Sequence, residues 1–231
     1  MKPLPVIALT GSDGSGKSTL AASLVARLRT LAPVEQLYLG QSSGKIGDWI
    51  GTLPVIGKRF KAYLVRKSDK VHDQPGKPPG NVTALAIYLL SRWRAYKFRR
   101  LLAMARRGTL VVTDRFPQAE KPGFSIDGPQ LAKTEGGNWW VRMLRQREHR
   151  LYEWMATHVP LLVIRLNVDV ETAHARKPDH KISSLREKIA AIPHLHFNGA
   201  AILDLDGRDA ADHVLESSMR AVTAALQVTG A

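Results

Sequence analysis

The chain has 231 residues, of which 44% are apolar and 23% charged, as is ordinary for a soluble globular protein with a full core. No run approaches the roughly 18 apolar residues of a membrane-spanning helix, and the absence of cysteine excludes disulfides and thiolate chemistry. We expect a single domain, 1–231, without a removable signal peptide.

The positive charge is concentrated in one stretch. The formal net charge is +14, and residues 41–107 hold 15 of the 34 Lys and Arg residues but only three acids. This concentration suggests an anionic partner on that side, which could be a phosphate, a nucleic acid or an acidic surface. The alternative is a solvated basic face that only aids solubility.

A strand, a glycine-rich turn and a helix are the first predicted elements. Residues 4–10 form a short apolar run, and from Lys17 onward leucines recur at helical spacing, at Leu20, Leu24, Leu28 and Leu31. The turn between them fits G-x-x-x-x-G-K-[ST], the pattern of a phosphate-binding loop. Its residues are Gly11, Ser12, Asp13, Gly14, Ser15, Gly16, Lys17, Ser18 and Thr19.

This loop predicts a site for a nucleoside triphosphate. Backbone N–H groups at a helix N-terminus point at the ligand, and the helix dipole favours negative charge there. Lys17 would reach the β- and γ-phosphates, and the Ser18 hydroxyl would bind Mg²⁺. We therefore expect ATP and Mg²⁺ as ligands, and dependence on ATP favours a cytoplasmic location.

Strands and helices are expected to alternate along the rest of the chain. The further strands are 34–40, 109–113, 161–166 and 201–205, and the further helices are 82–107, 139–158, 171–176, 184–191 and 210–227. This order predicts an α/β fold of the P-loop NTPase type, a three-layer sandwich in which helices cover both faces of a parallel five-stranded sheet. Ligands of such sheets bind at the carboxyl ends of the strands.

A second group of candidate residues follows the strand 109–113. Asp114 stands where a carboxylate holds Mg²⁺, either directly or through water. Arg115 beside it could clamp a transferring phosphoryl group, because a guanidinium meets phosphate oxygens in a bidentate manner. A simple ion pair at the strand end is the alternative.

With these motifs the chain resembles the thymidylate kinase-like group of nucleoside monophosphate kinases. Two specific motifs carry the resemblance, the loop Gly11–Thr19 and the strand end Asp114–Phe116. Tyr88–Arg92 is similar to the family's Phe-x-x-x-Arg, and Leu166–Asp169 followed by Arg176 is similar to the strand and first arginine of the family's lid. The motifs keep the family's order and span most of the chain.

The resemblance implies roles for single residues. Asp13 would contact the acceptor sugar, Tyr88 would stack on the base, and Arg92 would grip the acceptor phosphate together with Arg115. Arg176 would reach the phosphates of ATP as a lid at about 176–184 closes, joining Lys17, Asp114 and Arg115 as a catalytic residue. For Tyr88 a place in the core is the alternative, and Arg176 could equally be a solvated loop charge.

Departures from the family pattern fall on the acceptor side. The family's Arg-Glu-Pro after the second strand is replaced by Gly40–Ser43, its acid before the loop is Thr10, and Phe116 lacks the hydroxyl of its Asp-Arg-Tyr. Residues 41–80 form a basic insertion on that side. An acceptor other than dTMP follows, and some thymidylate kinase-like proteins of polysaccharide biosynthesis clusters look similar, including Arg107-Gly108.

We therefore expect an ATP-dependent kinase that acts on a small anionic acceptor, a nucleoside monophosphate or a related phosphate. A kinase for a glycan or other polyanion, with 41–107 as its platform, and a non-catalytic NTP-binding protein remain open. Nucleic acid is not expected, because no recognisable module accompanies the aromatic and basic residues. A homodimer stays open, and the histidines are expected to be packed or at the surface rather than metal ligands.

Overall fold

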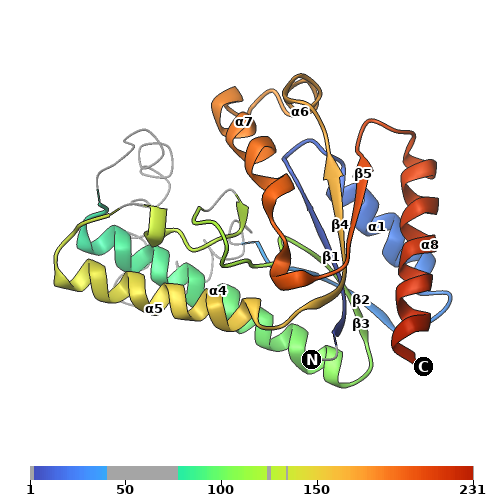
Figure 1. Cartoon of the computed structure of the whole chain (residues 1–231), viewed down its shortest axis with the longest axis horizontal. Coiled ribbons are helices and arrows are strands. Elements are labelled where there is room, and N and C mark those ends of the chain that lie inside the picture. Colours follow the sequence, from blue (N-terminus) through green and yellow to red (C-terminus); the bar gives the residue numbers. More distant parts are fainter. Residues whose placement is uncertain (1–2, 41–77, 124–125, 134, 231) are drawn as a thin grey trace, which may run out of the picture.

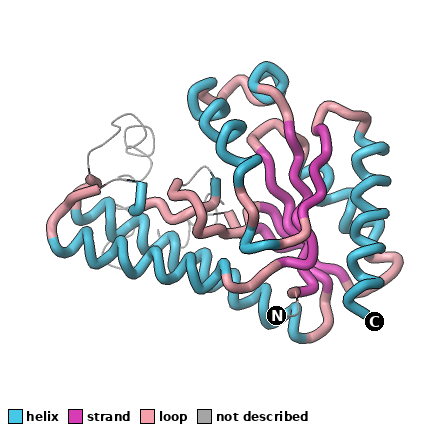
Figure 2. Tube along the Cα trace, viewed as in Figure 1, coloured by secondary structure: helices cyan, strands magenta, loops and turns pink. Residues whose placement is uncertain are grey.

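A five-stranded parallel sheet forms the centre of the protein (Figures 1 and 2). The computed structural model describes residues 3–40, 78–123, 126–133 and 135–230. The strand order is β2-β3-β1-β4-β5. The strands are β1 (Leu4–Gly11), β2 (Val34–Tyr38), β3 (Leu110–Asp114), β4 (Pro160–Asn167) and β5 (Ile202–Asp206).

Helices cover both faces of this sheet, which confirms the predicted three-layer α/β fold (Figure 1). Side chains alternate along β1, so that Ile7 and Leu9 face α1 and α8, whereas Val6 and Ala8 face α4 and α5. The helices are α1 (Lys17–Leu28), α4 (Asn81–Arg106), α5 (Trp139–Ala156), α6 (Val170–Arg176), α7 (Ile182–Ala191) and α8 (Ala211–Gly230).

The register of the central strands brings the predicted motifs to one edge of the sheet. Leu9 of β1 pairs with Asp114 at the end of β3, and Gly11 pairs with Leu166 near the end of β4. Because the strands are parallel, their carboxyl ends lie together. The loop after β1, the residues after β3 and the α6–α7 segment after β4 therefore meet at this edge.

Two details differ from the sequence predictions. The first helix ends at Leu28, so Leu31 lies beyond it and is 69% exposed. The helix predicted over 82–107 is α4, but its buried face is formed by small and basic residues as well as by Phe98 and Leu101. Residues 41–77, most of the predicted basic insertion, lie outside the described residues.

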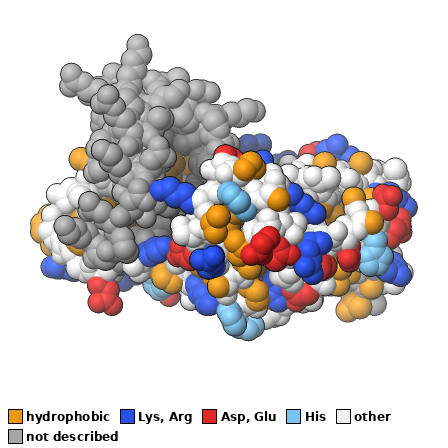
Figure 3. Space-filling view, turned by 90° about the horizontal axis from the view of Figure 1, so that it is seen from above, with side chains coloured by type: hydrophobic (Ala, Val, Ile, Leu, Met, Phe, Trp, Pro, Cys, Tyr) orange, Lys and Arg blue, Asp and Glu red, His pale blue; other side chains and the backbone are white. Residues whose placement is uncertain are grey.

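Of the helices in the described part of the chain, none has the length and apolar character that crossing a bilayer would require. Lys and Arg, acidic and His side chains stand side by side over α6 and α7, on the face seen from above (Figure 3). This part of the surface therefore carries charges of both signs.

Candidate functional site

The loop between β1 and α1 has the backbone of a phosphate-binding loop. Gly14 has φ +83°, a left-handed conformation that favours glycine. A Cβ atom on Gly14 would lie 2.6 Å from the carbonyl oxygen of Ala173 in α6, so the loop and α6 are in direct contact. Ser18 and Thr19 at the start of α1 are exposed and accessible to a ligand.

Lys17 is folded into the loop. Its side chain is buried, and its ammonium donates a 2.6 Å hydrogen bond to the carbonyl oxygen of Ser12 and lies 3.5 Å from the Ser15 hydroxyl. Burial lowers the pKa of Lys17, although Asp114 works in the opposite direction. A buried ammonium within a phosphate-binding loop is suited to binding phosphate oxygens.

Asp114 ends β3 and is buried beside Lys17 and Arg115. Burial raises the pKa of its carboxyl group, against the attraction of both cations. Its Oδ1 atom is buried without a hydrogen-bond partner. A buried, unpartnered carboxylate oxygen carries a free-energy cost that a bound cation would relieve.

Asp114 and the exposed hydroxyl of Ser18 fit a magnesium ion that keeps several waters and binds substrate phosphates. Within the described ranges there is no cluster of three or more His, Cys, Asp or Glu residues that could hold a metal ion. A metal site here would therefore draw most of its ligands from water and nucleotide.

Arg115 connects the end of β3 to the loop. Its backbone is left-handed, with φ 64°, which is uncommon outside glycine. Its guanidinium lies 2.9 Å from Oδ1 of Asp13 and 3.9 Å from Oδ1 of Asp127. Although burial lowers the pKa of Arg115, these carboxylates raise it overall, so the side chain stays charged.

Basic side chains from three segments of the chain surround the carboxylate of Asp13. Besides Arg115, Lys188 of α7 forms an ion pair with its Oδ2, and Nδ1 of His180 lies 3.6 Å from the same oxygen. Burial alone would raise the pKa of Asp13, but Lys188 and Arg115 lower it to about 2. Asp13 is therefore an anion at neutral pH and a hydrogen-bond acceptor rather than a proton-transferring base.

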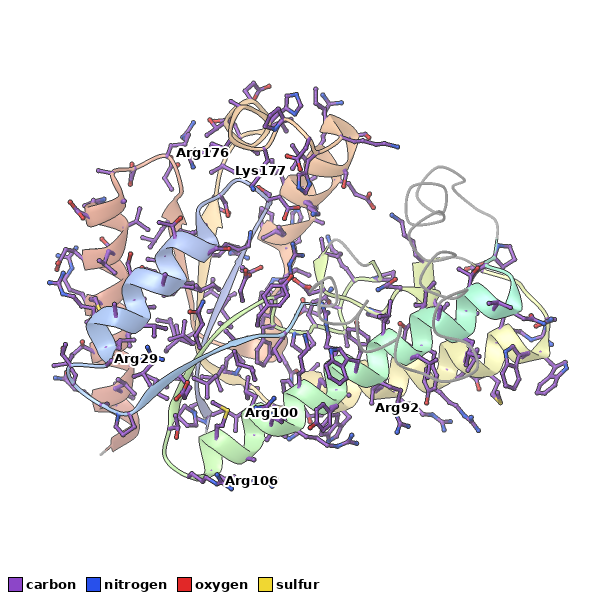
Figure 4. The ribbon with its side chains drawn as sticks, turned by 180° about the vertical axis from the view of Figure 1, so that it is seen from behind. Arg29, Arg92, Arg100, Arg106, Arg176 and Lys177 are labelled. Atoms are coloured by element: carbon purple, nitrogen blue, oxygen red, sulfur yellow. The ribbon has the colours of Figure 1, made fainter. Side chains whose placement is uncertain are left out.

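Arg176 lies against the loop, at the end of α6 where Figure 4 labels it beside Lys177. Its guanidinium donates hydrogen bonds of 3.2 Å to the carbonyl oxygen of Gly14 and 2.8 Å to that of Gly207. The structure thus places Arg176 beside the loop, and its role towards ATP stays a prediction.

On the acceptor side, the structure shows where Arg92 lies. Arg92 is exposed on α4, and Figure 4 shows it far from Arg176 at the loop. Arg94, two residues on, is 1% exposed and faces inward, since a shift of two residues turns a helical side chain by about 200°. The role of Arg92 towards the acceptor phosphate stays a prediction.

Arg94 holds several main-chain and side-chain groups together. It donates hydrogen bonds to the carbonyl oxygen of Leu39 at 3.0 Å, to Oδ1 of Asp127 at 2.7 Å and to the hydroxyl of Tyr152 at 3.3 Å. Lys97, one turn further, donates to the carbonyl oxygens of Tyr38 and Gly40. Two cations of α4 thus bind the end of β2, where the family motif Arg-Glu-Pro is missing.

Tyr88 is half-buried and packs against a small cluster formed by Ala84, Leu131, Val141 and Leu144 between α4 and α5. This position agrees with the core alternative for Tyr88. Its role in stacking a base stays a prediction.

Sequence reasoning missed Arg94, Asp127, His180 and Lys188. A stricter reading of helical spacing could have found Arg94, because Ser91, Arg94 and Phe98 lie on the buried face of α4. No local signal marks the other three, which reach the site only through the fold.

No family model matches the chain. It is 61% identical over 224 residues to the uncharacterized ATP-binding protein YghS of Escherichia coli K12, across 97% of this chain and 94% of YghS. It is 41% identical to the uncharacterized ATP-binding protein YghR of the same strain, across 94% of this chain and 86% of YghR. Among solved structures, a deoxyadenosine kinase from M. mycoides aligns over 95% of this chain and 99% of that chain, with 12% identity and a TM-score of 0.48.

Proposed function

The chain belongs to the family of uncharacterized ATP-binding proteins that includes YghS and YghR of Escherichia coli. From that premise we propose that it binds ATP with Mg²⁺ at the loop Gly11–Thr19 and transfers the γ-phosphoryl group to a small anionic acceptor. A nucleoside monophosphate or a related phosphate is the acceptor class that we favour, and the reaction is proposed to take place in the cytoplasm.

One observation carries the proposal. The unpartnered Oδ1 of Asp114 is buried at the end of β3, next to the loop that contains the buried ammonium of Lys17. An orphaned carboxylate oxygen beside a phosphate-binding loop supports a metal–phosphate site, because both groups gain partners when a metal-bound nucleotide enters.

In an in-line transfer of the phosphoryl group, the residues of the site would have different roles. Lys17 and the loop amides hold the phosphates, and Ser18 with Asp114 would hold Mg²⁺, which neutralises developing phosphate charge when bound. Arg115 and Arg176, which contact Asp13 and Gly14 of the loop, would neutralise further charge. Catalysis would then come from positioning and electrostatic stabilisation rather than from covalent chemistry.

The negative charge of Asp13 limits what this residue could do in the transfer reaction. Because its pKa is about 2, Asp13 would accept a hydrogen bond from an acceptor hydroxyl rather than remove a proton. Arg115, which contacts both Asp13 and Asp127, lies between the loop and the end of β2 and would meet the acceptor phosphate.

A polyanionic or glycan acceptor is a second candidate, favoured by one face of α4. Arg92, Arg99 and Arg106 are exposed at intervals of seven residues, and α4 contains no acid (Figure 4 labels two of them). The affinity of the protein for a polyanionic acceptor should fall steeply with added salt, while its affinity for ATP should change less. Equal salt dependence of the two affinities would remove this candidate.

The experiment is a screen with γ-labelled ATP and Mg²⁺ across nucleoside monophosphates, sugars and anionic glycans. We expect one acceptor class to be labelled by the wild type, and Lys17→Ala to lower transfer at least about 100-fold while folding is kept. Arg29→Ala, at the other end of α1, is the matched control and should transfer normally. Unchanged turnover by Lys17→Ala would contradict the proposal, and hydrolysis without any labelled acceptor would favour a non-catalytic ATP-binding protein.

A further inference from the structure

The ammonium of Lys188 lies at the phosphate-binding loop although it comes from α7, about 170 residues further along the chain. Lys188 is 7% exposed and forms an ion pair with Oδ2 of Asp13. Leu185, one turn earlier, is fully buried in a cluster with Ala173 of α6. The face of α7 that carries Leu185 and Lys188 is therefore the face that packs toward α6 and the loop.

The charges around Asp13 leave a surplus of cations. Lys17, Arg115 and Lys188 interact with the Asp13 carboxylate, while Asp114 and Asp127 are further acids that face Lys17 and Arg115. Asp127 also forms an ion pair with Arg94 at 2.7 Å. Even with all three acids ionised, the four cations, Arg94 included, exceed the three anions, so the site favours a ligand with negative charge.

The ammonium of Lys188 has more hydrogen-bond donors than its contact with Asp13 uses. An ammonium carries three N–H donors, and in the described part of the chain Asp13 is the hydrogen-bond acceptor recorded for it. Leaving donors of a buried cation unsatisfied costs free energy, which a bound anion would recover.

We propose that Lys188 is a phosphate-binding residue of the transfer site. Asp13 holds its ammonium beside the loop in the ligand-free protein, and the terminal phosphoryl group of a bound nucleoside triphosphate takes up its remaining donors. The inference rests on the proposed function, because it assumes that the loop holds the phosphates of that nucleotide. By this inference α7 contributes one cation, Lys188, which binds the phosphates together with Arg115 and Lys17.

The test compares two nucleotides that differ by one phosphoryl group. Affinities for ADP and for β,γ-imido-ATP, both with Mg²⁺, are measured by calorimetry on the wild type, Lys188→Ala and Lys188→Arg. We expect Lys188→Ala to weaken binding of the triphosphate analogue about tenfold or more and binding of ADP less than about twofold. Lys188→Arg should keep most of the selectivity, because it keeps the charge.

Arg186→Ala is the matched control, since Arg186 is an exposed cation on the same helix, and it should bind both nucleotides like the wild type. If Lys188→Ala does not fold, Lys188→Gln keeps most of the length of the side chain and removes its charge. Equal weakening of ADP and the triphosphate analogue, or no weakening of either, would show that Lys188 only fastens α7 to the loop and would overturn the inference.

The outcomes separate this inference from the proposed function. A wild type that binds the triphosphate analogue but labels no acceptor refutes phosphoryl transfer, while the comparison of nucleotides still decides the role of Lys188. A wild type that labels an acceptor, together with a Lys188→Ala variant of unchanged selectivity, refutes the inference alone. A wild type that binds no triphosphate refutes both.

Discussion

Replacing Arg94 by methionine should destabilise the protein strongly, whereas replacing Arg92 by alanine should not. Methionine would leave Oδ1 of Asp127 and the carbonyl oxygen of Leu39 without the donors that now lie at 2.7 and 3.0 Å. Removing one partner of a buried ion pair typically costs about 3–5 kcal/mol. Arg92 is exposed, and a surface change of this kind usually stays within about 0.5 kcal/mol.

The free energy of unfolding of both variants can be measured by urea denaturation, followed by tryptophan fluorescence with the wild type as reference. Arg94→Lys is a useful third variant, because it keeps the charge but cannot reproduce the several directions in which the guanidinium donates. We expect it to lie between the wild type and Arg94→Met. A loss below about 1 kcal/mol for Arg94→Met, or a larger loss for Arg92→Ala, would refute the assignment of Arg94 as the buried anchor of β2.

Three further predictions concern the loop and its neighbours. Asp13→Asn should cost about 2 kcal/mol at pH 7, because its pKa is lowered from 3.8 to about 2 and each tenfold change in proton affinity corresponds to about 1.4 kcal/mol. The stabilisation is complete above pH 3.8 and is lost as the pH falls toward 2, so urea denaturation at pH 5 and pH 7 should give equal differences. Gly14→Ala should abolish nucleotide binding and lower the melting temperature, since its Cβ would lie 2.6 Å from the Ala173 carbonyl oxygen. Gly80→Ala should leave both unchanged, because no atom of the described residues lies within 4 Å of a Cβ built there. Asp114→Asn should raise the melting temperature of the ligand-free protein at pH 7, because burial raises the pKa of Asp114 and the neutral amide avoids that cost, yet it should remove the Mg²⁺ dependence of nucleotide binding.

Each of these three predictions has an outcome that would contradict it. The prediction for Asp13→Asn would be contradicted by a free energy of unfolding equal to that of the wild type at pH 7, or by a difference from the wild type that changes between pH 5 and pH 7. For Gly14→Ala it is nucleotide affinity like that of Gly80→Ala in calorimetry. For Asp114→Asn it is a lower melting temperature in differential scanning calorimetry, or binding that still depends on Mg²⁺.

The fold could be predicted to a large extent, because its signals are local. Apolar runs mark the strands, and helical spacing of leucines marks α1, so the order of elements and the parallel sheet follow from neighbours along the chain. Boundaries were less certain, as Leu31 shows: a leucine at helical spacing continues the pattern even where the helix has already ended.

Part of the candidate site could likewise be predicted from local sequence, and part of it could not. The loop Gly11–Thr19 and Asp114-Arg115 are contiguous motifs whose chemistry can be recognised without a structure, and the fold brings both to one edge of the sheet. The prediction for Arg92 rests on its spacing from Tyr88, which resembles a family motif. That spacing does not determine which face of α4 is buried, and the packing against β2 and α5 turned Arg94 inward instead.

By itself, then, the sequence determined the α/β order of elements, the phosphate-binding loop and the carboxylate at the end of β3, since each depends on residues close together in the chain. Only the tertiary structure decided which charges surround that loop. Asp127 and Lys188 lie far from Asp13 in sequence, and no local pattern distinguishes them from solvated charges. They are recognisable as part of the site because burial and short distances to Arg115 and Asp13 couple them to it.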